Sequence, residues 1–386
     1  MTLFQHTIDA HGDFELVSDI KRTVDYAVAI PDQGEIAGLV VYIAGFGEDA
    51  GSYRKNFQNH ICKDYQMACL SVDYHCIFSR PDNGAAITIE TETLTLLRSF
   101  TGLTHHENID DIMFKAAEMK ADPTTPLVIP GTLVPGNKEY QNFGILPALD
   151  HIFAINDLFL KHPHIPKTIY AIGSSYGGYI ANLISKLAPC TLNAIFDNSS
   201  WATPNLKYIN GQEQNLTEFE GYLSSNVILS LNVLSPWTHQ PFMPNYFNEN
   251  RKQIRSFPEN HLEVMGKTSN RKTIYRCVHA KVDVISDTEA KRLFVNDLKK
   301  NGFDVQMEIY SKENIDGRYI KHMEHGMGLS MRLFFANALK QTQTKIKNDQ
   351  RLDFDFEHTL YFPCDTQTYV IRYKNHSQPK CILIDK

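Results

Sequence analysis

The segment from Ile169 to Ile184 constrains the fold of this chain more than any other. It contains the run Gly173-Ser174-Ser175-Tyr176-Gly177, which lies between a short apolar stretch and a helical pattern of apolar residues. This order predicts a strand, a sharp turn and a helix, and such a turn exposes the hydroxyl of its central serine. Glycines at 177 and 178 would let the helix approach the strand closely. The alternative is a chance match on a tight turn, but the flanking pattern favours Ser175 as a nucleophile.

Apolar runs and helical patterns alternate on both sides of this segment. The runs over residues 38–46 and 67–73 are almost continuously apolar, as expected of strands buried on both faces. A strongly periodic helix is expected over 148–161. Residues 13–31 alternate apolar and polar side chains, and we expect two early antiparallel strands there, at Phe14–Val17 and Val24–Ile30. The whole pattern predicts an α/β fold with a mostly parallel sheet covered by helices on both faces.

Two long stretches interrupt the alternation, at about residues 80–147 and 202–266. Both follow expected carboxyl ends of core strands, the edge where open α/β sheets bind ligands. Long insertions there favour a lid or a substrate pocket, and structural padding is the alternative. We therefore expect a core over residues 1–341 with two insertions. A β-rich extension is expected over residues 342–386.

Composition excludes several classes of function. Hydrophobic residues make up 42% of the chain, charged residues 21%, and the net charge is −6 without a long basic run. Nucleic acid is therefore not an expected partner, because phosphate binding requires clustered Lys and Arg. No apolar run is long enough to span a bilayer, and the N-terminus has no secretion-signal pattern. Seven cysteines without a Cys-x-x-Cys pair indicate thiols in a reducing compartment, so a cytoplasmic location is expected and a metal site is not.

A serine nucleophile requires a base, and the base requires an orienting acid. On this architecture the acid follows the serine in the sequence and the base comes last. Asp283 lies four residues past a strand expected to end at His279, which makes it the candidate acid. Asp287 fits better as the N-cap of the next helix. Asp197, at the end of the preceding strand, is the alternative acid.

The candidate base follows the last core strand, which is expected over residues 304–310. His325 is followed by Gly326 and Gly328, which suits a loop that enters a helix. His322, three residues earlier, is the alternative base. Both histidines could instead be surface residues of the loop.

Negative charge that develops on a substrate carbonyl oxygen requires fixed hydrogen-bond donors. One expected donor is the backbone N–H of Tyr176, the residue after the nucleophile. The second is the backbone N–H of Phe46, in the loop Ala44–Asp49 that follows an early strand. A plain glycine turn is the alternative interpretation of this loop.

These features resemble the α/β-hydrolase superfamily over roughly residues 35–340, apart from the insertions. The segment from His279 to Gly302 resembles the acid loop of the prolyl-oligopeptidase and acyl-esterase branch. The resemblance implies Ser175, Asp283 and His325 as nucleophile, acid and base. It also implies Phe46 and Tyr176 as oxyanion donors. Members often have His-Gly where this chain has Ala44-Gly45, so the backbone donor is still expected but a side-chain role at position 44 is not.

The whole chain also resembles an uncharacterised bacterial family of expected α/β-hydrolases found among flagellin-glycosylation genes. That resemblance implies an acylated sugar, or its nucleotide-linked precursor, as substrate. Aromatic side chains in the second insertion, or directly before it, could stack on a sugar ring or form the core of a lid: Trp201, Tyr222 and Trp237.

The leading functional hypothesis is a serine esterase that removes a small acyl group from a carbohydrate. The alternatives are an acyltransferase with the same triad, a small-peptide peptidase and a non-catalytic binding protein. Only about 35 residues precede the first core strand, fewer than one propeller blade requires, which disfavours a propeller-bearing oligopeptidase. The expected chemistry uses no metal or organic cofactor. The sequence does not reveal the oligomeric state.

Overall fold

The central element of the fold is a sheet of eight strands in the order β1-β2-β4-β3-β7-β8-β11-β12. The computed structural model describes residues 1–16, 21–47, 51–102, 109–118, 126–136, 139–268, 273–346 and 351–386. The first two strands run antiparallel to their neighbours and the other pairs are parallel. The strands are β1 (Thr2–Asp9), β2 (Thr23–Ile30), β3 (Leu39–Ile43), β4 (Ala68–Asp73), β7 (Ile169–Ser174), β8 (Ala194–Asn198), β11 (Ile274–Ala280) and β12 (Val305–Tyr310).

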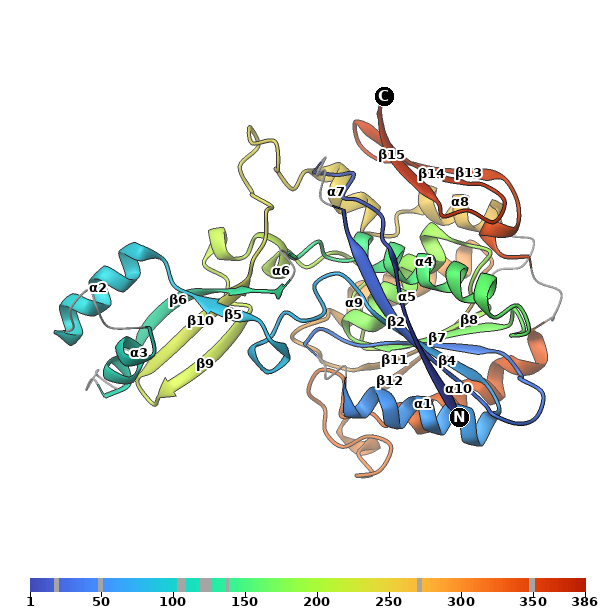
Figure 1. The fold of residues 1–386 in the computed structure, drawn as a ribbon, viewed down its shortest axis with the longest axis horizontal. Coiled ribbons are helices and arrows are strands. Elements are labelled where there is room, and N and C mark those ends of the chain that lie inside the picture. The colour runs from blue at the N-terminus through green and yellow to red at the C-terminus, as the bar shows by residue number, and fades with distance from the viewer. Residues whose placement is uncertain are drawn as a thin grey trace. The chain divides into compact units, whose positions relative to one another are not determined.

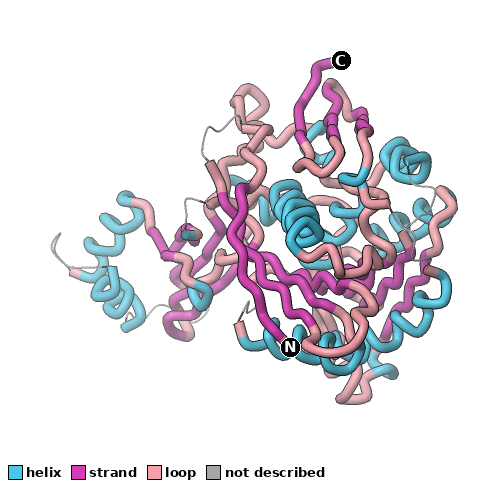
Figure 2. Tube along the Cα trace, turned by 45° about the vertical axis from the view of Figure 1, so that its right-hand side comes forward, coloured by secondary structure: helices cyan, strands magenta, loops and turns pink. Residues whose placement is uncertain are grey.

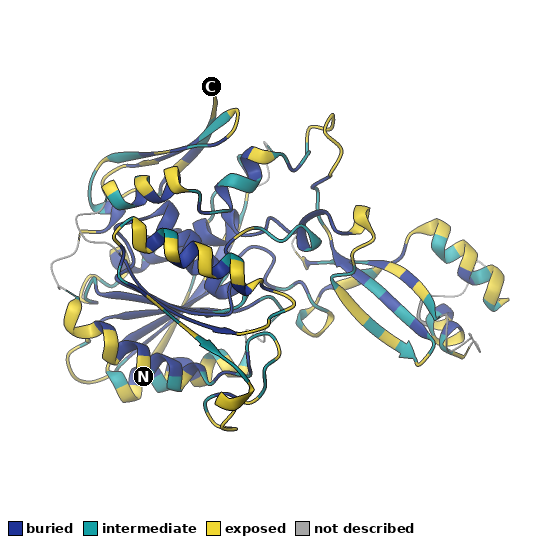
Figure 3. Ribbon diagram, turned by 180° about the vertical axis from the view of Figure 1, so that it is seen from behind, coloured by how far each residue is buried: buried dark blue, intermediate teal, exposed yellow. Residues whose placement is uncertain are grey.

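Helices cover both faces of this sheet (Figure 1). Helices α1 (Ser52–Tyr65) and α10 (Met331–Thr342) lie on one face. Helices α4 (Ile145–Lys161), α5 (Tyr176–Leu187) and α9 (Thr288–Lys300) lie on the other. Strands β3 and β8 are buried along their whole length, which explains their almost continuous apolar sequences (Figure 3). The strand order and the helices on both faces confirm the predicted α/β-hydrolase fold.

One early strand was placed wrongly by the sequence pattern. Residues 14–16 form a turn, and Val17 lies outside the described residues. The turn forms because Asp13 Oδ1 accepts the backbone N–H groups of Glu15 at 2.9 Å and Leu16 at 3.1 Å. An aspartate that bonds the backbone in this way competes with strand pairing. The antiparallel partner of β2 is instead β1, which the sequence analysis did not identify.

The same turn carries Glu15 into a fully buried ion pair with Arg255. Arg255 Nη1 donates to Glu15 Oε1 at 2.8 Å, and the Tyr369 hydroxyl donates to the same oxygen at 2.7 Å. Both charged side chains are at most 1% exposed. Burial alone would raise the pKa of Glu15, but the charge and hydrogen bonds of Arg255 outweigh burial and hold that pKa below its usual 4.5. Through these two contacts Glu15 ties the N-terminal segment to Arg255 and Tyr369, which lie in distant parts of the sequence.

Glu15→Ala is expected to lower the free energy of unfolding by about 3–5 kcal/mol, because it leaves the Arg255 charge buried without its partner. Urea denaturation at neutral pH measures the loss, with Glu35→Ala, an exposed carboxylate, as the control. Since the folded-state pKa of Glu15 is depressed, its contribution is present above pH 4.5 and is lost as the pH falls through the folded-state pKa. Equal unfolding free energies for Glu15→Ala and Glu35→Ala would contradict this role.

The insertions form a compact unit of their own, made of residues 76–142 and 205–247. Its sheet has the strand order β5-β6-β10-β9. The strands are β5 (Ala86–Thr88), β6 (Leu127–Val134), β9 (Phe219–Ser224) and β10 (Val227–Val233). The helices are α2 (Thr91–Thr101), α3 (Ile109–Glu118) and α6 (Lys207–Asn210). These limits differ from the expected 80–147 and 202–266, since residues 248–266 belong with the core.

The C-terminal residues form a separate antiparallel sheet that packs on helices of the core unit (Figure 2). Its strands are β13 (His358–Pro363), β14 (Gln367–Tyr373) and β15 (Lys380–Asp385), next to α7 (Glu249–Ile254) and α8 (Glu259–Thr268). The Tyr373 hydroxyl donates to the carbonyl of Leu187, at the end of α5, at 2.8 Å. Within the described residues, no helix combines the length and the apolar character needed to cross a membrane.

Candidate active site

Ser175 lies on a strained turn between β7 and α5. Its backbone angles are φ 54° and ψ −120°, a conformation that non-glycine residues rarely adopt. A Cβ atom at position 177 would lie 2.1 Å from the Ile43 carbonyl oxygen, and one at position 173 would lie 2.3 Å from the Gly177 carbonyl carbon. Only glycine fits at these two positions. The predicted sequence of strand, sharp turn and helix is confirmed, together with the need for small residues around it.

The structure joins Ser175, His325 and Asp283 in one chain of hydrogen bonds. His325 Nε2 lies 2.7 Å from Ser175 Oγ. On the other side of the ring, His325 Nδ1 lies 2.8 Å from Asp283 Oδ2 and 3.0 Å from Oδ1. With a proton on Nδ1 donated to the carboxylate, Nε2 is the acceptor that a serine hydroxyl requires. The three residues predicted from the sequence therefore meet in the arrangement that activates a hydroxyl.

The loop after β11 holds Asp283 as a carboxylate. Its Oδ1 accepts the backbone N–H groups of Ile285 at 2.9 Å and Ser286 at 3.0 Å. Burial alone would raise the pKa of Asp283, but the hydrogen bonds from His325 and from these N–H groups outweigh it, so the pKa lies below its usual range. The side chain is therefore ionised at neutral pH, as an orienting acid must be.

Trp201 fixes this arrangement from the side. Its Nε1 donates to the Ile285 carbonyl at 2.8 Å, and its ring stacks on the His325 imidazole at 6.1 Å between centroids. Trp201 is buried, so it supports the candidate base rather than offering a face to a sugar ring. Trp237 is also buried, and its Nε1 donates to the Gln141 carbonyl at 3.1 Å. Of the three aromatic residues considered from the sequence, Tyr222 has the exposed side chain.

The alternative acid and base have other partners. Asp197 is fully buried and forms an ion pair with Lys291, while its Oδ2 accepts hydrogen bonds from Ser200 Oγ at 2.7 Å and Asn182 Nδ2 at 2.8 Å. His322 is a half-exposed side chain whose Nδ1 lies 3.8 Å from Glu324 Oε2. Asp287 caps α9 by accepting the Glu289 N–H at 3.0 Å, which confirms its predicted role.

The two residues expected to supply the oxyanion donors have side-chain rings in contact. Tyr176 begins α5, Phe46 follows β3, and their rings make an edge-to-face contact at 5.3 Å. The Tyr74 hydroxyl donates to the carbonyls of Ala44 at 2.9 Å and Gly45 at 3.3 Å. In a trans peptide the N–H points away from the carbonyl, so the Phe46 N–H is directed away from Tyr74. The donor roles stay predictions, and Glu48 and Asp49 of the same loop lie outside the described residues.

Asn198, at the end of β8, was not identified from the sequence. Its backbone carbonyl accepts the Ser175 N–H at 2.7 Å. Its side-chain Nδ2 donates to Ser174 Oγ at 2.9 Å and to the Gly326 carbonyl at 3.0 Å. One residue thus ties the serine turn to the residue that follows His325. No sequence spacing identifies Asn198, because it reaches the serine turn only through the pairing of β8 with β7.

Asn198→Ala is expected to lower kcat for an activated ester such as p-nitrophenyl acetate by about 10–100-fold, with a smaller change in KM, because a shift of about 1 Å between nucleophile and base has that effect. Asn198→Asp should behave similarly, since a carboxylate cannot donate to Gly326. Ser199→Ala is the comparison: it removes the hydrogen bond that Ser199 Oγ donates to Asn198 Oδ1 at 3.1 Å but keeps both amide donors, so a smaller loss of kcat is expected. Steady-state kinetics on folded protein measures the effect. Wild-type kcat in both Asn198 variants would show that the amide does not position the site.

Comparison with solved structures finds proteins of low sequence identity. The Pyrococcus horikoshii acylaminoacyl peptidase has a TM-score of 0.48 and 12% identity, with 91% of this chain and 43% of that chain covered. A putative dipeptidyl aminopeptidase IV from Bacteroides ovatus has a TM-score of 0.49 and 10% identity, with coverages of 90% and 36%. A fungal esterase from Rhizomucor miehei has a TM-score of 0.44 and 11% identity, with coverages of 89% and 85%.

This chain spans less than half the length of those two peptidases. No curated protein matches it. A family model matches residues 4–380, almost the whole sequence. The chain therefore belongs to the family described as "Protein of unknown function (DUF2920)".

Proposed function

We propose that this protein is a serine hydrolase that cleaves an ester or amide through an acyl-enzyme on Ser175. The observation that carries the proposal is the hydrogen-bonded chain from Ser175 Oγ through His325 to Asp283. The strained backbone of Ser175 adds support, because it presents the hydroxyl at the end of β7 rather than within the helix. Asp197 and His322, the alternatives, have different partners.

The geometry supports a two-step reaction. His325 Nε2 takes the hydroxyl proton as Ser175 Oγ attacks the substrate carbonyl, and Asp283 stabilises the resulting imidazolium. The N–H groups of Tyr176 and Phe46 would donate to the oxyanion. His325 then protonates the leaving alcohol or amine. In the second step a water, deprotonated by His325, attacks the acyl-enzyme and releases the carboxylic acid and Ser175.

We propose a small acyl group on a carbohydrate as the substrate within this class. The support is the resemblance of the chain to expected hydrolases found among flagellin-glycosylation genes. The insertion unit joins the core after β4 and β8, and the lid or substrate-pocket role expected for it from the sequence stays a prediction. A cytoplasmic location belongs to the same proposal.

The test is a substrate panel with purified protein. It compares p-nitrophenyl acetate and octanoate, O-acetylated and N-acetylated monosaccharides, and aminoacyl p-nitroanilides, each with and without a free sugar as acceptor. The proposal expects turnover of the acetyl esters, with acetate released whether or not the sugar is present. Formation of acetylated sugar at the expense of acetate would instead show that the protein is an acyltransferase. Faster turnover of the aminoacyl p-nitroanilides than of the acetyl esters would show that it is a peptidase. No turnover of any substrate by folded protein would contradict catalysis.

A further inference from the structure

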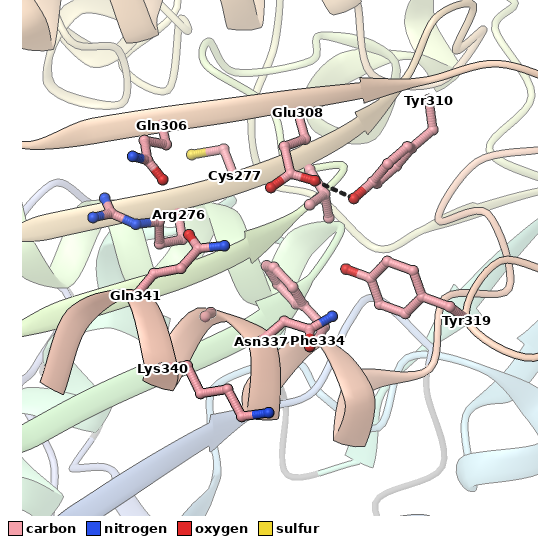
Figure 4. A pocket seen from close by; sticks show the side chains of 12 residues that line it. Arg276, Cys277, Gln306, Glu308, Tyr310, Tyr319, Phe334, Asn337, Lys340 and Gln341 are labelled. Carbon is pink, nitrogen blue, oxygen red and sulfur yellow. Dashed lines mark hydrogen bonds between the residues drawn. The ribbon is translucent and has the colours of Figure 1, made fainter. Parts of the chain in front are cut away.

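A second candidate site lies in a groove between α10 and the last two strands of the central sheet, β11 and β12. The groove encloses a cavity of about 290 Å³ and is lined by β11, β12 and α10 together with Tyr319 (Figure 4). Parallel pairing places Arg276 beside Gln306 and Val278 beside Glu308. All of these residues belong to the core unit. A pocket of this size suits a small ligand, since typical sites for drug-sized molecules have about 300–1,000 Å³.

Arg276 gives one end of the groove positive charge and donors that lack acceptors. Its side chain is 3% exposed, and Nη1 donates to Asp304 Oδ1 at 3.0 Å. The other oxygen of Asp304 accepts from Lys345 Nζ at 2.6 Å, so one carboxylate serves two cations. Nε and Nη2 of Arg276 are buried and have no hydrogen-bond partner among the residues that the structure describes. Buried charged donors without acceptors are costly, and an anionic ligand oxygen would satisfy them.

The remaining lining completes a polar site with an apolar floor. Lys340 adds a further cation, and Glu308 is the carboxylate of the opposite wall. At the far end from Arg276, the rings of Tyr310 and Tyr319 meet edge to face at 6.1 Å, and the Tyr310 hydroxyl donates to Glu308 (Figure 4). The buried side chain of Phe334 forms part of the floor. These groups match a ligand with one anionic group and a short body that carries hydroxyls.

We infer that this groove binds a small hydroxylated organic anion, with its anionic group near Arg276, its hydroxyls near the two tyrosines, and Lys340 as a second cation of the lining. The elements that line it also carry the candidate acid and base. Strand β11 leads into the loop that carries Asp283. Tyr319 lies six residues before His325, and α10 begins a few residues after His325. A ligand that contacts both segments, and that binds one arrangement of them more tightly than another, would shift the balance between those arrangements and so act as an effector. This last step rests on the proposed function, whereas binding does not.

Isothermal titration calorimetry on the full chain tests binding, with glycerol 3-phosphate as the hydroxylated anion, inorganic phosphate as the bare anion and glycerol as the matched neutral control. We expect saturable binding of glycerol 3-phosphate, weaker binding of phosphate and none of glycerol. Lys340→Gln, on the groove wall, should weaken binding about tenfold, and Tyr319→Phe about fivefold. Arg276→Gln should weaken it most, with a thermal melt to confirm folding. The matched control is Arg332→Gln, which removes a cation of α10 that does not line the groove and should bind as wild type.

Two results would overturn the inference. One is the absence of saturable binding of both anions by folded wild type up to about 10 mM. The other is equal affinity in wild type, Lys340→Gln and Arg332→Gln. The effector role is read separately from kcat for p-nitrophenyl acetate with and without glycerol 3-phosphate. Binding without any change in kcat would overturn the effector role alone, and an inactive protein that still binds would count against the proposed function but not against the site.

Discussion

Ser175→Ala is expected to lower kcat for p-nitrophenyl acetate by at least about 10³-fold, because no other group can form the acyl-enzyme once the hydroxyl is removed. The hydroxyl contacts His325 Nε2 at 2.7 Å, so the substitution removes one hydrogen bond of the site and creates no large cavity. The melting temperature should therefore stay close to that of the wild type. Initial rates measured over a range of substrate concentrations give the change.

The neighbouring serine supplies the matched control. Ser174 Oγ accepts a hydrogen bond from Asn198, whereas Ser175 Oγ contacts His325, so we expect Ser174 to position the turn rather than to attack. Ser174→Ala should retain far more activity than Ser175→Ala. If the two variants lost activity equally while both stayed folded, Ser175 would not be the nucleophile. Wild-type rates in Ser175→Ala would contradict the whole mechanism.

Asp283→Asn is the second prediction with a large expected effect. An amide at this position preserves the shape but can place an N–H toward His325 Nδ1, which favours the tautomer with the proton on Nε2. That tautomer cannot accept the hydroxyl proton, so kcat should fall by about 10⁴-fold while KM changes little. The measurement is steady-state kinetics at pH 7.

Asp197→Asn is the comparison that separates the two candidate acids. Asp197 pairs with Lys291 in the buried interior, so its substitution should lower stability more than Asp283→Asn does. Thermal melts of both variants, read beside kcat, distinguish the two effects. A larger loss of kcat in a folded Asp197→Asn protein than in Asp283→Asn would reverse the assignment of the acid.

The sequence predicted those parts of the structure that depend on local pattern and chain order. Ser175 and Asp283 follow the buried strands β7 and β11, His325 follows the more exposed strand β12, and the carboxyl ends of parallel strands meet at one edge. Their order in the chain and their position after strands, with the glycines that follow His325, favoured these residues and left Asp197 and His322 open as alternatives. The distances between them come only from the structure.

The features that the sequence did not predict depend on contacts between distant segments, or on residues whose usual structural preference differs from the structure that they adopt here. Asn198 donates a hydrogen bond to the Gly326 carbonyl and Trp201 donates one to the Ile285 carbonyl. Both bonds join segments that are far apart in the sequence, so no local pattern reveals them. Strand β6 contains Pro130 and Gly131, two residues that disfavour strands, so the sheet of the insertion unit was not expected. The turn at Asp13 replaced a strand because a side-chain hydrogen bond overrode the alternating pattern.

The central claim is that Ser175 is an activated nucleophile, and its most direct test is intact mass after incubation with a fluorophosphonate probe. The account predicts a single adduct on the wild type that peptide mapping locates at Ser175. It predicts the same adduct on Ser174→Ala and none on Ser175→Ala. An adduct of unchanged amount on folded Ser175→Ala, or no adduct on folded wild type, would contradict the claim.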